Sequence, residues 1–146
     1  MILPVLLMLQ ADVARESTPQ EIDFCSGPES DQGLRFCLAD KLHERAEHDL
    51  RAAVTSARRS AMVQRRQIAA FSKKNGGVTL SGDPVRALVA SQSAWKRSYR
   101  ADCIVVGLSV ATGNAGTEGV TSNRNCEANR ILDRVAFLKQ TYSTER

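Results

Sequence analysis

The chain has 146 residues, of which 42% are hydrophobic and 25% are charged. This length fits a single domain, and this composition excludes an intrinsically disordered chain. Aromatic residues make up only 5% of the chain, whereas Ala, Leu, Arg and Gln are frequent, so helix is favoured over strand. The formal net charge of +4 suits an anionic partner but does not identify one.

The N-terminal residues are predicted to be a targeting segment. An apolar run occupies residues 2–9 and is far shorter than the roughly 20 residues that span a bilayer. Ala11 and Ala14 offer cleavage positions, although no Lys or Arg precedes Arg15 to form a basic n-region. We expect residues 1–14 to be a signal peptide and the protein to be periplasmic or secreted, without a transmembrane anchor. The alternative is a buried apolar strand or helix at the N-terminus.

An apolar pattern with helical spacing begins at Leu34. Steps of three and four recur as far as Phe71, with no Gly or Pro before Asn75, which predicts one long helix or two with a break near residues 58–60. Asp83 and Pro84 then give a cap and a first turn for a second helix, which we expect to end near Val106.

The remaining segments are assigned by composition. Residues 107–122 contain four glycines and are predicted to form a long irregular loop, and residues 15–32 an extended lead-in. A last helix is expected at about residues 123–141. The predicted fold is all-α, a small three- to four-helix bundle with a long helical hairpin, disulfide-stapled at one end, in one domain over residues 23–141.

Four cysteines, Cys25, Cys37, Cys103 and Cys126, predict two disulfides in a small exported chain. Three pairings are possible. We favour Cys25–Cys37 with Cys103–Cys126 because both bonds close short loops. The nested pairing, Cys25–Cys126 with Cys37–Cys103, is the alternative. The wide spacing lacks the close cysteine pair of structural zinc sites, so we expect no metal.

The stretch Gln92-x-x-Trp95-x-x-x-Tyr99-Arg100-x-x-Cys103 resembles the signature of the LprI-type lysozyme inhibitor family. The twelve-residue step between the first two cysteines is similar to the family pattern too, and the resemblance spans about residues 23–138. Arg51 departs from it, because the family usually has Asn there. The resemblance implies an exported, helical, disulfide-containing protein that inhibits lysozyme. Further positions that match the family are Glu47, Leu50, Gly116, Thr117 and Arg134.

Gln92, Trp95 and Tyr99 lie on one stripe of the predicted second helix. We interpret the two aromatic residues as core and Gln92 as a hydrogen-bond partner of a neighbouring helix or loop backbone. Arg100, beside this stripe, could pair with Glu47 or Asp49 of the first helix. The functional alternative is that these groups line a cleft for a glycan or a partner loop.

Three basic pairs recur at steps of seven and eight, which return to nearly the same face of a helix over about 20 Å. Such a strip is either a solvated face or a docking surface for an anionic envelope polymer. Nucleic acid is a poor candidate, because no aromatic residue interleaves with the strip for base stacking. The pairs are Arg58-Arg59, Arg65-Arg66 and Lys73-Lys74.

The sequence gives little support for catalysis or for a cofactor. His43 and His48 are five residues apart, which misses the spacing of paired helical metal ligands, and no phosphate-binding glycine motif is present. We therefore expect a non-enzyme. The leading hypothesis is that residues 107–122, with Gly116, Thr117 and Glu118, occlude the glycan cleft of a lysozyme or another cell-wall hydrolase. The alternative is an envelope-associated binding module that uses the basic strip without inhibiting any enzyme.

Charge is a difficulty for the inhibitor hypothesis. Animal lysozymes are basic, so a positively charged inhibitor is steered away from them. Glu118 or the acidic face at residues 40–49 would have to supply the local attraction.

Overall fold

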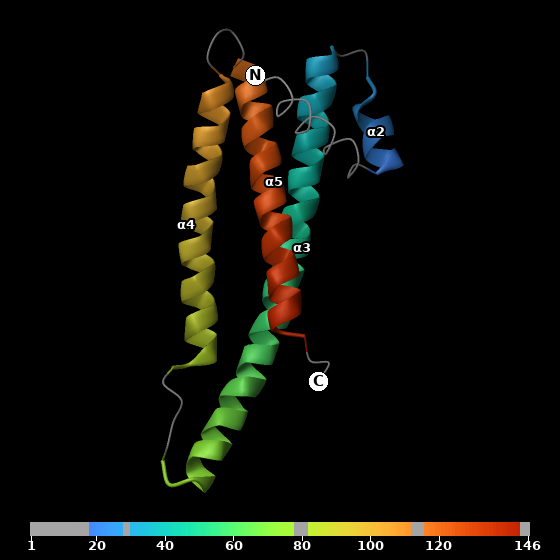
Figure 1. Ribbon diagram of the computed structural model, residues 1–146. Helices are drawn as coiled ribbons and strands as arrows, with labels where there is room; N and C mark the ends of the chain where they lie inside the picture. The colour runs from blue at the N-terminus through green and yellow to red at the C-terminus, as the bar shows by residue number, and fades with distance from the viewer. Residues whose placement is uncertain (1–17, 28–29, 78–81, 112–115, 144–146) are drawn as a thin grey trace.

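A computed structural model describes residues 18–27, 30–77, 82–111 and 116–143. The signal peptide predicted at residues 1–14 lies outside these ranges. The described residues form helices and no strand, which confirms the all-α prediction (Figure 1). The helices are α2 (Pro19–Cys25), α3 (Asp31–Lys74), α4 (Pro84–Val110) and α5 (Gly116–Thr141).

The three long helices run side by side, and α5 packs against both α3 and α4 (Figure 1). The short helix α2 lies beside the first part of α3. The end of α4 and the start of α5 lie at the same end of the bundle as α2, and the end of α3 lies at the other end. No helix in the described ranges is long and apolar enough to cross a bilayer.

Helix α2 corrects the prediction of an extended lead-in. Thr18 and Glu21 form a capping box, in which the Glu21 N–H donates to Thr18 Oγ1 at 3.3 Å and the Thr18 N–H donates to Glu21 Oε2 at 2.7 Å. Pro19 occupies the first turn, where its missing N–H leaves no bond unmade. These local signals start a helix within a segment whose polar composition suggested none.

Helix α3 is continuous over 44 residues, so of the two alternatives the single long helix is correct. Ser30 caps its start by accepting from the Gly33 N–H. It ends before Gly76 and Gly77, whose positive φ angles of 68° and 89° suit glycine. Small side chains form most of its buried face and permit close packing of α5. The buried residues are Leu38, Ala39, Leu42, Ala46, Ala53, Ala57 and Ala61.

The predicted loop at residues 107–122 is wrong. Helix α4 continues to Val110 and α5 begins at Gly116, so most of that segment is helical. Gly107 and Gly119 lie where α4 and α5 approach most closely. A Cβ on either glycine would be 2.8 Å from the backbone oxygen of the other. These glycines therefore serve helix packing and not a loop.

The core consists of two clusters along the bundle axis, and Leu50 packs against both. The cluster nearer the disulfides contains Leu42, Ala46, Tyr99, Cys103, Ala128 and Ile131. The second contains Ala53, Ala57, Ala61, Leu88, Val135 and Leu138.

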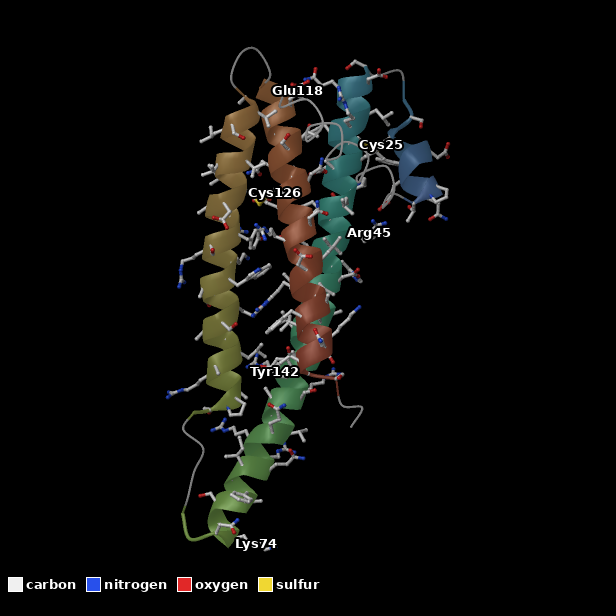
Figure 2. All side chains as sticks on the ribbon, in the orientation of Figure 1. Cys25, Arg45, Lys74, Glu118, Cys126 and Tyr142 are labelled. Carbon is white, nitrogen blue, oxygen red and sulfur yellow. A yellow bond between two sulfur atoms is a disulfide. The ribbon has the colours of Figure 1, made fainter. Side chains whose placement is uncertain are left out.

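Two disulfides connect all four cysteines and confirm the favoured pairing. Cys25 is bonded to Cys37, with a Cα–Cα distance of 5.8 Å, and joins α2 to α3. Cys103 is bonded to Cys126, with a Cα–Cα distance of 5.5 Å, and joins α4 to α5. Cys25 and Cys126 are labelled in Figure 2, toward the end that holds α2, the end of α4 and the start of α5. We call this the disulfide end.

Candidate functional site

The family-signature residues of α4 and α5 meet around the guanidinium group of Arg134. Its Nε donates a short hydrogen bond to Gln92 Oε1, and its Nη2 donates to Ser91 Oγ at 2.7 Å. Its Cζ lies 5.5 Å from the centroid of the Trp95 ring and 4.8 Å from that of Phe137. The guanidinium therefore has neutral acceptors at its edge and aromatic rings within cation–π distance.

Burial lowers the pKa of Arg134. No carboxylate lies within ion-pair distance of its guanidinium in the part of the chain that the structure describes. Burial therefore disfavours the charged form, and the hydrogen bonds to Gln92 and Ser91 and the nearby aromatic rings offset part of this cost. Gln92 accepts its bond from the neighbouring helix, which is one of the two partners that the sequence suggested.

Trp95 and Tyr99 pack against each other one helical turn apart. Their ring centroids are 4.5 Å apart and the rings are tilted by 36°. Tyr99 is only 3% exposed and belongs to the core, whereas Trp95 is half-buried against it. Burial raises the pKa of Tyr99, and the Arg100 side chain beside its hydroxyl opposes this effect. The pair thus contributes to the core of the bundle.

The expected pair between Arg100 and Glu47 is not formed. Glu47 Oε2 instead lies 3.8 Å from Arg51 Nη1 on its own helix, and Arg100 is exposed. Arg51, which replaces the Asn of the family pattern, thus pairs with Glu47 in place of Arg100.

A network of polar side chains joins α3 to α5 near the disulfides. His43 Nε2 lies 3.1 Å from Glu127 Oε2, and both side chains are mostly buried. Arg124 lies 3.6 Å from the same carboxylate and 3.4 Å from Asp40. Glu127 is more than 80 positions from His43 in the sequence, so residue spacing does not predict this contact. No group of three His, Cys, Asp or Glu side chains able to hold a metal occurs among the described residues.

The residues proposed to bind a partner lie at the disulfide end. Gly116, Thr117 and Glu118 form the first turn of α5 and are exposed, so they belong to a helix and not to a loop (Figure 2). Two apolar side chains on the adjoining turns are exposed too, Leu108 at 65% and Val120 at 49%. The Cys103–Cys126 bond and the close contact of the two glycines fix these turns relative to each other.

Charge is separated along the bundle. Residues 18–50 contain eight carboxylates and three Lys or Arg, whereas residues 51–82 contain seven Lys or Arg and no carboxylate. The acidic segment forms α2 and the half of α3 nearer the disulfide end. The basic segment leads to Lys74 at the opposite end (Figure 2). The small net charge therefore conceals an acidic end and a basic end.

All six residues of the predicted basic strip are exposed on α3. Arg65 Nε lies 3.4 Å from Asp83 Oδ2, at the cap of α4. The other members lie along the same half of α3, and the last four are beyond the end of α5 (Figure 1).

A groove of about 540 Å³ lies between α3 and α5. Its lining includes the small side chains of Ala52 and Ala53 and the opposite charges of Asp49 and Lys139. Tyr142 and Ser143 line it near the end of α5.

These features define a small, helical protein with two disulfides. The family described as Lysozyme inhibitor LprI matches the chain over residues 25–138. The chain therefore belongs to the LprI lysozyme inhibitor family, a family of inhibitors and not of enzymes, as its signature residues predicted. Comparison with curated proteins and with solved structures gave no match.

Proposed function

We propose that this protein is an exported inhibitor that docks its disulfide end on a lysozyme-type cell-wall hydrolase and occludes the glycan cleft. The observation that carries the proposal is the rigid arrangement of Leu108, Glu118 and Val120 on helix ends joined by a disulfide. Family membership supplies the class of target. Two disulfides are compatible with an oxidising compartment outside the cytoplasm.

The disulfide end combines the two properties that a docking surface needs. Exposed Leu108 and Val120 offer apolar area that a partner can remove from water. Because the Cys103–Cys126 bond holds α4 and α5 together before binding, little conformational entropy is lost on association. A convex helical tip of this kind fits a concave cleft.

Repulsion between a basic inhibitor and a basic lysozyme is avoided if the acidic end of the inhibitor faces the enzyme. A lysozyme approaching the disulfide end encounters the acidic segment at residues 18–50 and Glu118, while the basic segment lies at the far end. Asp23, Asp31 and Glu118 are exposed there. Association is therefore steered toward the end that docks, and its rate should fall as salt is added.

Titration of several lysozyme types with the oxidised protein, assayed as clearing of cell-wall substrate, tests this proposal. We expect saturable inhibition of at least one type. Glu118→Lys and Leu108→Asp should each weaken it by about ten-fold, a typical effect of a central interface residue. Asp133→Lys on α5 and Val89→Asp on α4 are matched controls, because both positions are exposed and nearer the other end of the bundle.

The absence of inhibition across all lysozyme types would contradict the proposal. Equal losses in the matched controls would show that general charge or folding, and not the disulfide end, governs the effect.

A further inference from the structure

We propose that the free end of α3, residues 62–74, docks on the surface of an anionic phospholipid bilayer. We call this segment the basic arm. It is separate from the disulfide end, and the proposal does not depend on lysozyme inhibition.

The basic arm projects beyond the body of the bundle. Ser60 Oγ donates to the backbone oxygen of Tyr142 at 3.1 Å, so α5 ends level with Ser60. Ala61 is the last fully buried residue of α3. The thirteen residues that follow extend α3 by about 20 Å at 1.5 Å per residue, and Figure 1 shows this part past the end of α5.

The cations of the basic arm are almost unopposed. The nearest carboxylate in the sequence is Asp83, and it pairs with Arg65. Arg66, Lys73 and Lys74 are exposed and have no ion-pair partner in the described ranges. The arm therefore presents a positive field that an anionic surface would neutralise.

Apolar side chains share the exposed face with these cations. The exposed fraction of the residue is 39% for Met62, 48% for Val63 and 59% for Phe71. At about 100° per residue, one half of the helix circumference holds these three side chains with Arg66, Lys73 and Lys74. The opposite half contains Ile68 and Ser72, which are half-buried, and Arg65, which faces α4.

This mixture of groups favours a lipid surface over a soluble polyanion. A polyanion would neutralise the cations but would leave Met62, Val63 and Phe71 in water. At a bilayer interface the anionic headgroups meet the cations while the apolar side chains enter the boundary with the acyl chains. A single phenylalanine also gives nucleic-acid bases little to stack on.

Flotation of the full oxidised chain with vesicles tests the inference directly. We expect binding to phosphatidylcholine vesicles that contain phosphatidylglycerol, little binding to phosphatidylcholine alone, and release as salt is raised. The triple change R66E/K73E/K74E should reduce binding by about ten-fold or more, since each cation adds to the attraction. The matched control R86E/K96E/R97E makes the same charge change at exposed positions of α4 and should retain most of the binding.

A second variant distinguishes lipid from polyanion. V63S/F71S keeps every charge and should also weaken vesicle binding, because the apolar contribution is lost. Unchanged binding of V63S/F71S, together with full displacement by inorganic polyphosphate, would overturn the lipid proposal in favour of a soluble polyanion. Equal loss in the α4 control would show that only net charge matters. Circular dichroism melting of each variant separates loss of binding from loss of the fold.

Discussion

Arg134 lies close to two aromatic rings and hydrogen-bonds to Gln92 and Ser91 across the α4–α5 interface. The planar guanidinium allows one residue to make edge contacts and face contacts at the same time, which a lysine cannot do. The signature residues therefore have a structural role: they orient α5 against α4. Tyr99 is buried and Trp95 is half-buried, so both aromatic residues contribute to the core.

Replacing Arg134 by Lys should lower the free energy of unfolding by about 2 kcal/mol, through loss of a charge-assisted hydrogen bond and of the aromatic contacts. Arg130→Lys is the control, because Arg130 is exposed one turn earlier on α5, and it should change stability by less than about 0.5 kcal/mol. Urea unfolding measures both. Equal effects at the two positions would contradict the structural role.

The buried Tyr99 hydroxyl should make the protein sensitive to alkali. Burial raises the folded-state pKa of Tyr99 above the ordinary value of 10.0. The neutral Tyr99 hydroxyl therefore stabilises the folded protein fully below about pH 10. This contribution to the free energy of unfolding is lost as the pH rises through the folded-state pKa. Between about pH 9 and pH 11, the urea midpoint of Tyr99→Phe should fall less than that of the wild type. Parallel curves would show that the Tyr99 proton is not coupled to folding.

Two glycines of the α4–α5 interface have a role that their sequence does not reveal. Counting glycines predicts a loop at residues 107–122, yet Gly107 and Gly119 are helical and allow two backbones to approach. Glycine in a sequence indicates either a turn or a close contact, and only the partner helix distinguishes them. The start of α2 is different, because its capping signal, Thr18 followed by Glu21, is local and can be seen in the sequence.

Gly119→Ala should destabilise the protein by about 1–3 kcal/mol, because the added Cβ would overlap the backbone oxygen of Gly107. Gly116→Ala introduces the same methyl group at the start of α5, where nothing lies within 4 Å. It should be neutral or slightly stabilising. Thermal unfolding of the two variants gives the comparison. A stable Gly119→Ala protein would mean that α4 and α5 are further apart than described.

The disulfide that joins α4 to α5 closes a loop of 23 residues. Replacing both Cys103 and Cys126 by Ala should cost about 3 kcal/mol, chiefly because the unfolded chain gains freedom. Chemical unfolding of the double variant, compared with the oxidised wild type, measures this cost. A loss below about 1 kcal/mol would show that helix packing alone fixes this end.

At the scale of the whole molecule, local signals predicted much of the fold and little of its surfaces. Helical periodicity predicted α3, and loop-closure entropy predicted the disulfide pairing, since both depend on neighbours in sequence. The contact between Gln92 and Arg134 spans 42 positions and requires the packed bundle. The groove between α3 and α5 likewise exists only after the two helices meet.

The arrangement of charge also becomes meaningful only in three dimensions. In the sequence of α3, a segment rich in acidic residues is followed directly by a basic segment. Because α3 is one continuous helix that runs along the bundle, they become two ends of an elongated molecule (Figure 1). We propose that one end binds a basic enzyme and the other an anionic surface. Salt should therefore weaken both interactions, while substitutions at one end should leave the other unaffected.

Hydrogen–deuterium exchange in the presence of an inhibited lysozyme tests whether the protein docks through its disulfide end. We expect slower amide exchange in the last turns of α4, at residues 104–110, and in the first turns of α5, at residues 116–122. Exchange at residues 62–74 should remain unchanged. Protection confined to the basic arm, or no protection at the disulfide end despite inhibition, would contradict it.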